Sequence, residues 1–169
     1  MAELRGLSRT WRSGADVDVR PTSDRALVIG FGNPLREDDG IGWQAAELLQ
    51  GKVPEGLAEI VCCHQLTPEL AMQLETASLT IFLDASLEQA AGEVVCRPIH
   101  PEDGGASSHH LSPGQLLQFT RHLTGITPSA FLITGGAFRM NLGHRLTEIG
   151  EKTAQRMAEV AATAISLTT

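Results

Sequence analysis

The feature that most constrains this chain is an apolar segment that runs into a glycine turn and then into a helix opened by two aspartates. The sequence reads Leu27-Val-Ile-Gly-Phe-Gly-Asn-Pro-Leu-Arg-Glu-Asp-Asp-Gly-Ile-Gly42. Gly30 and Gly32 allow a tight turn, because glycine adopts positive φ without a steric penalty. After the turn, apolar residues recur at helical spacing, at Ile41, Ala45, Leu48 and Leu49. The pattern predicts a buried strand and a helix whose first turn carries Asp38 and Asp39.

Both aspartates have an ordinary structural explanation. Carboxylates at a helix N-terminus cap backbone N–H groups and interact favourably with the helix dipole, by roughly 0.3–2 kcal/mol each. Two adjacent caps would be redundant, so we expect one aspartate to cap the helix and the other to serve chemistry. Ligands bind open α/β sheets at the carboxyl ends of the strands, and the pair lies at such an end.

A dinucleotide-binding turn is the obvious alternative for a Gly-x-Gly sequence, and two features argue against it. Its fingerprint needs a third glycine at position 35, where this chain has Leu35. It also needs an acidic residue at the end of the second strand to bind ribose, where this chain reads Cys62-Cys63-His64. Acidic residues at the helix start would moreover repel a pyrophosphate. The loop is therefore suited to binding a cation.

Length and composition indicate a single soluble domain. The chain has 169 residues, of which 42% are hydrophobic and 20% charged, and a net charge of −7 argues against nucleic acid or an anionic membrane as a partner. No apolar run approaches the roughly 20 residues of a membrane span. Residues 1–24 show no clean period, so we predict a flexible N-terminal extension there and one domain over residues 25–169. An odd number of cysteines, three, favours the reducing cytoplasm.

Strand and helix patterns alternate along the chain. Strands are expected at Ala26–Gly30, Leu57–Cys63, Leu79–Asp84, Gly92–Pro98 and Ala130–Thr134. Helices are expected at Asp38–Gln50, Pro68–Glu75, Ser112–Leu123 and Leu146–Leu167. The last helix is expected to bury a stripe formed by Ile149, Thr153, Met157, Val160 and Ala164. This alternation predicts a three-layer α/β/α sandwich with a mainly parallel twisted sheet.

Polar side chains at the strand ends are expected to converge. Asp84 directly follows the apolar run Leu79–Leu83, and this third strand is expected beside the first, which would bring Asp84 close to the aspartate pair. Asp84 could alternatively cap the turn that follows. His109 and His110 precede a predicted helix, and imidazole is a good ligand for nickel, zinc, copper and iron. His64 ends the second strand on the same rim and is a weaker candidate.

Three motifs together resemble the hydrogenase maturation proteases, the endopeptidases that finish the large subunit of nickel–iron hydrogenases. They are Gly30-Phe-Gly-Asn-Pro-Leu-Arg-Glu-Asp-Asp-Gly-Ile-Gly42, Ile81-Phe-Leu-Asp-Ala85 and Ser108-His-His-Leu-Ser-Pro-Gly-Gln-Leu-Leu117. Their order and spacing fit from about Ala26 to Ala164. Carried over by motif, the family's metal-contacting acid, aspartate and histidine fall on Asp39, Asp84 and His109. Shifting the third motif by one residue would select His110 instead, but the leucines that follow favour His109.

The resemblance implies a reaction and a partner. The protein would remove a C-terminal extension from the precursor of a hydrogenase large subunit after nickel has been loaded, with the nickel supplied by the substrate. Asp39 and Asp84 would be catalytic, and Asp38 would have a supporting or substrate-orienting role. The family often has an Asp-Gly-Gly-Thr turn where this chain reads Cys63-His-Gln-Leu-Thr-Pro-Glu69, which leaves the identity of the substrate open. The alternative is a non-catalytic, metal-dependent chaperone that binds the same subunit without cutting it.

Overall fold

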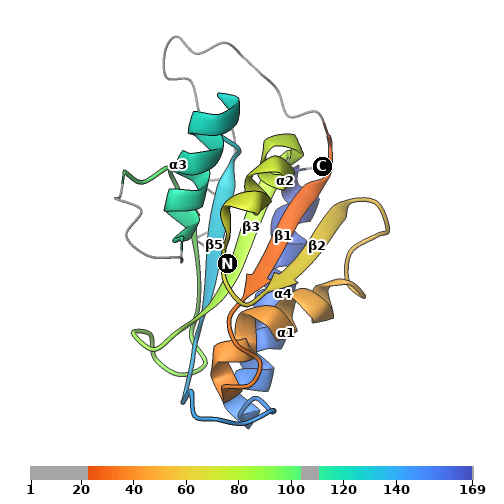
Figure 1. Ribbon diagram of the computed structural model, residues 1–169. Coiled ribbons are helices and arrows are strands. Elements are labelled where there is room, and N and C mark those ends of the chain that lie inside the picture. Colours follow the sequence, from red (N-terminus) through yellow and green to blue (C-terminus); the bar gives the residue numbers. More distant parts are fainter. Residues whose placement is uncertain (1–22, 104–110, 169) are drawn as a thin grey trace.

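A twisted sheet forms the centre of the protein in the computed structural model, which describes residues 23–103 and 111–168 (Figure 1). Within these residues the sheet has five strands in the order β2-β1-β3-β5-β4. Their bounds are β1 Ala26–Phe31, β2 Ala58–Cys63, β3 Leu79–Ser86, β4 Val94–Ile99 and β5 Ala130–Gly136. All neighbours are parallel except β4, which pairs antiparallel with β5. The mainly parallel sheet and the pairing of β3 with β1 are confirmed.

Helices cover both faces of the sheet, which gives the expected three-layer sandwich (Figure 1). The α-helices are α1 Ile41–Leu49, α2 Ala71–Thr76, α3 Pro113–Thr124 and α4 Glu148–Thr168, with 3-10 turns η2 Glu37–Gly40 and η3 Pro68–Leu70. Helices α1 and α4 pack together over one face. Helices α2 and α3 share the cluster on the other face. Among the described residues, no helix is long and apolar enough to cross a membrane.

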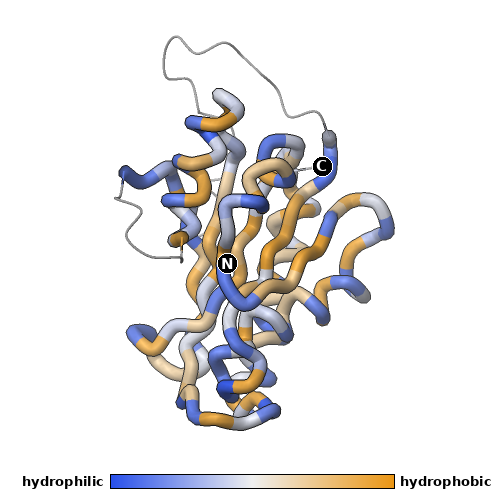
Figure 2. The backbone as a smooth tube through the Cα atoms, in the orientation of Figure 1, coloured by the Kyte–Doolittle hydropathy of each residue, from blue (hydrophilic) through white to orange (hydrophobic). Residues whose placement is uncertain are grey.

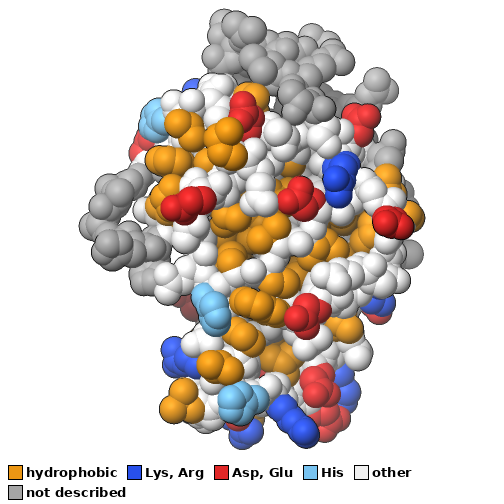
Figure 3. Space-filling view, turned by 45° about the vertical axis from the view of Figure 1, so that its right-hand side comes forward, with side chains coloured by type: hydrophobic (Ala, Val, Ile, Leu, Met, Phe, Trp, Pro, Cys, Tyr) orange, Lys and Arg blue, Asp and Glu red, His pale blue; other side chains and the backbone are white. Residues whose placement is uncertain are grey.

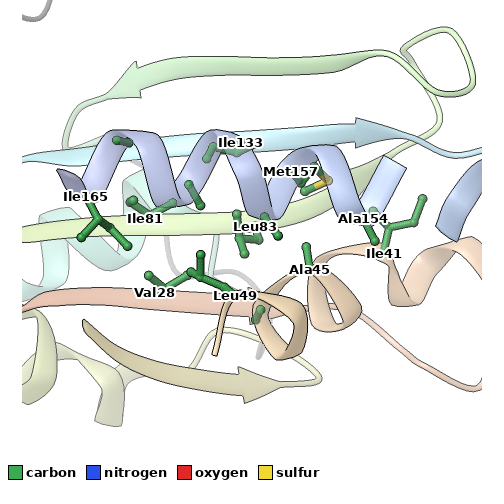
Figure 4. Close-up of a cluster of buried hydrophobic side chains, with 14 of the residues drawn as sticks. Val28, Ile41, Ala45, Leu49, Ile81, Leu83, Ile133, Ala154, Met157 and Ile165 are labelled. Carbon is green, nitrogen blue, oxygen red and sulfur yellow. The ribbon is translucent and has the colours of Figure 1, made fainter. Parts of the chain in front are cut away.

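The central strands supply both halves of the core, because successive side chains of a strand point to opposite faces. On β1, Val28 faces α1 and α4, while Leu27 and Ile29 belong to the cluster beneath α2 and α3. Figure 4 shows the first cluster, in which Leu83 of β3 and Met157 of α4 lie among the packed side chains. Figure 2 shows the same arrangement as hydrophobic strands at the centre, with hydrophilic and hydrophobic stretches mixed in the surrounding helices and loops. Both faces of β1 and β3 are therefore anchored, which fixes their carboxyl ends.

Several element boundaries differ from the sequence-based expectation. β3 and β5 each run two residues further than predicted, so Asp84 is not the last residue of β3 but lies within it, opposite Thr134 of β5. The predicted helix at Asp38–Gln50 begins as a 3-10 turn and becomes α-helical only at Ile41. Most of the predicted N-terminal extension, residues 1–22, lies outside the described residues.

Candidate active site at the carboxyl ends of β1 and β3

The two glycines of the first turn let the helix begin directly against the strand. A Cβ at Gly30 would collide with the backbone carbonyl of Gly42 and with the Ala46 side chain. Gly32 has a φ of +129°, and a Cβ there would collide with the backbone carbonyl of Asp39. Both positions therefore require glycine. Gly30 is needed for close packing, and Gly32 is needed both for close packing and for its positive φ. Together they hold the start of η2 and α1 against the end of β1.

Asp39 is positioned by the turn that precedes it. Its carboxylate Oδ2 accepts a hydrogen bond from the backbone N–H of Asn33 at 3.3 Å, and the Asn33 side chain in turn accepts one from the backbone N–H of Leu35 at 2.9 Å. Neither η2 nor α1 has a side-chain N-cap. The expectation that one of the two aspartates caps the helix is therefore wrong, because their carboxylates bind other backbone groups.

Asp84 lies in β3, beside the end of β1. Its carboxylate accepts a hydrogen bond from the backbone N–H of Ala85 at 2.8 Å. The pKa of Asp84 is raised from 3.8 to about 7, chiefly by burial; the hydrogen bond from Ala85 lowers it, and the negative charge of Asp39 adds a smaller rise. A carboxyl with such a pKa exchanges a proton near neutral pH, as a general acid or base must.

Asp39 and Asp84 line one cavity of about 370 Å³ at the carboxyl rim of the sheet. The rest of its lining comes from the end of β1, from the loops that follow β1 and β2, and from the residue before the N-cap of α3: Phe31, Gly32, Asn33, Arg36, His64, Gln65, Leu66 and Leu111. His64 is packed against Trp43, with ring centroids 5.3 Å apart. Of the groups predicted to converge at the strand ends, Asp39 and Asp84 line this cavity together with the weaker candidate His64, whereas Asp38 does not line it. The predicted His109 and His110 lie outside the described residues.

Asp38 has a different environment from its neighbour Asp39. It is fully buried, and its carboxylate accepts hydrogen bonds from the backbone N–H of Phe138 at 2.9 Å and from the N–H and Oγ1 of Thr147, both at 2.8 Å. The N–H of Arg139 lies 3.5 Å from the same carboxylate. Asp38 therefore ties the segment between β5 and α4 to the first turn, and it does not line the cavity.

The predicted histidines, His109 and His110, lie outside the described residues. Leu111, which follows them, lines the cavity, and Ser112 caps α3 through a reciprocal pair of hydrogen bonds with Gln115. In the part of the chain that the structure describes, no group of three or more His, Cys, Asp or Glu side chains could hold a metal ion. The two carboxylates of the cavity can supply oxygen ligands to an ion brought from outside.

Sequence reasoning did not single out Arg36, which lines the cavity. Its guanidinium donates a hydrogen bond to the carbonyl of Met140 at 3.2 Å, so it also contacts the segment after β5. The sequence feature that could have identified Arg36 is its position in the loop between the glycine turn and the aspartate pair. Burial raises the pKa of the thiols of Cys62, Cys63 and Cys96 above the ordinary value.

Comparison with known proteins identifies the fold. No family model matches the chain, and no curated protein matches it. A [NiFe] hydrogenase maturation protease, HycI from Thermococcus kodakarensis KOD1, superimposes with a TM-score of 0.69 at 24% identity over 85% of this chain and 93% of that one. The hydrogenase maturating endopeptidase HybD from E. coli gives 0.69 at 23% identity, also over 85% and 93%. A hydrogenase 2 maturation peptidase from a Thaumarchaeota archaeon gives 0.66 at 24% identity over 85% and 99%. The chain has the fold of these proteins over most of its length.

Proposed function

We propose that this protein is an endopeptidase that removes a C-terminal extension from the nickel-loaded precursor of a hydrogenase large subunit. The observation that carries the proposal is the meeting of Asp39 and Asp84 in one cavity, at the carboxyl rim of a sheet with the fold of hydrogenase maturation proteases. Two carboxylates that share a cavity but have different hydrogen-bond environments are suited to acid–base chemistry.

The reaction that we assign to the cavity is hydrolysis of a peptide bond. A water molecule attacks the scissile carbonyl carbon, the carbon–nitrogen bond breaks, and the water's protons pass to the new carboxyl group and the leaving amine. The raised pKa of Asp84 supports a role as the group that takes and returns a proton at neutral pH. Asp39, whose negative charge helps to raise that pKa, is assigned as the second catalytic carboxylate.

Nickel enters this proposal as part of the substrate. Asp39, Asp84 and His109 are assigned to contact the nickel that the precursor's cysteines carry, because carboxylate and imidazole ligands suit a divalent first-row ion. The metal would polarise the scissile carbonyl or the attacking water. The substrate's metal then serves as the recognition element, so only a loaded precursor would be cut. We assign the reaction to the cytoplasm, as the odd number of cysteines suggests.

The test uses the purified protein and the precursor in two states. Incubation with the nickel-loaded precursor should release a C-terminal peptide, which mass spectrometry of the precursor detects as a loss of mass. The nickel-free precursor should stay intact. Asp39→Asn and Asp84→Asn provide matched controls, because they keep the side-chain shape and remove the carboxylate. Equal cleavage of both precursors would refute recognition through nickel. Complex formation with unchanged mass would instead identify a non-catalytic chaperone.

A further inference from the structure

Two segments that are far apart in the sequence lie side by side next to the cavity. Residues 35–37 lead into η2, which begins at Glu37, and residues 138–145 follow β5. The N–H of Gly143 donates to the carbonyl of Leu35 at 3.0 Å, and the N–H of Glu37 donates to the carbonyl of Gly143 at 3.2 Å. Glu37 has a φ of +45°, which is uncommon for a residue other than glycine. The segments therefore form one braced unit.

The Glu37 side chain holds the two segments together from within. Its Oε2 accepts hydrogen bonds from Nε of Arg139 at 3.0 Å and from the backbone N–H of Asn141 at 3.3 Å. A residue kept in the left-handed region persists only where its surroundings fix it, and such residues concentrate at functional sites. Residues 35–37 and 138–145 therefore form one well-braced surface, which we call the platform.

This platform exposes apolar side chains. Leu35 is 50% exposed, Phe138 57% and Leu142 89%. Three arginines, Arg36, Arg139 and Arg145, stand in the same two segments against the single acid Glu37, although the whole chain has a net charge of −7. We call Leu35, Arg36, Phe138, Arg139, Leu142 and Arg145 the rim surface.

Figure 3 shows hydrophobic, basic and histidine side chains at the lower end of the molecule, with acidic side chains to their right; this is the end at which Figure 1 draws the segment after β5. The rim surface is continuous with the candidate active site, because Arg36 belongs to both. A second cavity, of about 340 Å³, opens beside it, with Arg145 and Trp43 in its lining together with Glu47 and Glu151 on its α1 and α4 sides. Apolar anchors with neighbouring pockets and arginines are typical of sites that bind another protein.

We infer that the rim surface docks an acidic segment of the protein substrate that also carries apolar side chains. The inference rests on the proposed function and adds to it a second contact, outside the cavity. Charge complementarity selects the occupant, since arginines on an otherwise acidic protein attract acidic partners and repel basic ones. The docked segment would place the scissile bond at the neighbouring cavity, so its contribution is to binding rather than to the chemical step.

The experiment compares two matched triple variants. The rim variant is Phe138→Ser, Leu142→Ser and Arg145→Glu. The control variant is Phe119→Ser, Leu123→Ser and Arg121→Glu, which changes the same residue types on exposed positions of α3. That part of α3 leads to the start of β5, at the opposite end of the molecule (Figure 1). Thermal unfolding of both variants establishes that they are folded.

Cleavage of the nickel-loaded precursor is then measured over a range of substrate concentrations. The rim variant should raise KM about tenfold or more with kcat within about twofold, and the control should match wild type. Raising NaCl from about 0.05 to about 0.5 M should raise the wild-type KM more than that of the rim variant. An unchanged KM, or an equal rise in the control, overturns the inference. The inference is also overturned if sedimentation shows that wild type is a dimer and the rim variant a monomer, because the rim surface would then bind a second copy of this chain.

Failure of the docking inference can be told apart from failure of the proposed function. If wild type cuts the precursor and the rim variant does so with the same KM, the function stands and the docking surface is wrong. If wild type does not cut, the proposed function fails, and binding of the precursor to the immobilised protein still tests the surface. Binding that the rim variant loses and the control keeps supports docking, and the absence of binding overturns it.

Discussion

The buried carboxylate of Asp38 accepts two hydrogen bonds from Thr147, one from the backbone N–H and one from Oγ1, each 2.8 Å long. Thr147 directly precedes α4 and also accepts a hydrogen bond from the backbone N–H of Gly150 at 3.0 Å. Asp38 therefore fixes the start of α4 as well as the segment after β5. Because Asp39 is the next residue, the same contacts also hold the turn from which Asp39 reaches the cavity.

Replacing Asp38 should destabilise the whole protein. Asp38→Ala would remove the carboxylate that accepts from the N–H groups of Phe138 and Thr147, and hydrogen bonds to a charged group contribute about 1.5–3 kcal/mol each before relaxation. We expect a loss of about 3 kcal/mol in the free energy of unfolding, measured in urea. Asp38→Asn keeps one acceptor oxygen and should lose less. A loss under about 1 kcal/mol for Asp38→Ala would mean that these hydrogen bonds contribute little to the stability of the fold.

Replacing Gly32 should disturb the site through the backbone. Gly32→Ala would place a Cβ against the carbonyl of Asp39 at a φ of +129°, so the turn must move and Asp39 with it. We expect a loss of at least about 2 kcal/mol in stability and a large loss of precursor cleavage.

Gly56→Ala is the matched control for Gly32→Ala. Gly56 also has a positive φ, of +89°, but nothing lies within 4 Å of its would-be Cβ. It should lose only about 1 kcal/mol and keep its cleavage activity. Equal losses of stability and activity in the two variants would show that backbone conformation alone, and not the contact with Asp39, is the reason why position 32 needs glycine.

The placement of Asp39 and Asp84 in one cavity could be predicted from the sequence, and the contacts of Asp38 could not. Continuous apolar runs identified β1 and β3 as central parallel strands, and the carboxyl ends of neighbouring parallel strands meet at one edge. The partners of Asp38 are backbone groups and a hydroxyl about 100 residues away, and backbone groups leave no pattern in a sequence. The role of Asp38 therefore required the structure.

Helix α4 shows a second reason why prediction was incomplete. The predicted stripe included Thr153, Met157 and Ala164, which are buried, but Val160 is only partly buried and Ile149 is 40% exposed. The helix instead buries three alanines that the pattern did not single out, Ala154, Ala158 and Ala161. These small residues belong to the cluster in which α1 and α4 pack together. The predicted stripe therefore missed the face of α4 on which the small size of these alanines allows α1 and α4 to approach each other.

The titration of Asp84 should make stability depend on pH. Its pKa in the folded protein, about 7, lies above the ordinary value of 3.8, so between these values the folded state binds more protons than the unfolded state. The free energy of unfolding should therefore fall as pH rises from about 4 to about 7, by up to about 4 kcal/mol for the full difference. Urea unfolding at several pH values measures this.

Asp84→Asn isolates the contribution of this carboxyl, because the amide stays neutral across the range. As pH rises from about 4 to about 7, the free energy of unfolding of wild type should fall relative to that of Asp84→Asn, so wild type becomes the less stable of the two. A difference that stays constant between about pH 4 and about pH 7 would show that Asp84 is ionised throughout, and would remove the support for its role in proton transfer.

Substitution of the two adjacent histidines decides which of them contacts the substrate's nickel. If Asp39, Asp84 and His109 act together, His109→Ala should abolish processing of the nickel-loaded precursor, while His110→Ala should have a mild effect. A ligating imidazole must be neutral, and the ordinary pKa of histidine is about 6.5, so processing by wild type should also fall as pH drops below that region. Mass spectrometry of the precursor measures both effects. Loss of processing in His110→Ala with activity retained in His109→Ala would show that the motif is aligned one residue too early and that His110 is the ligand.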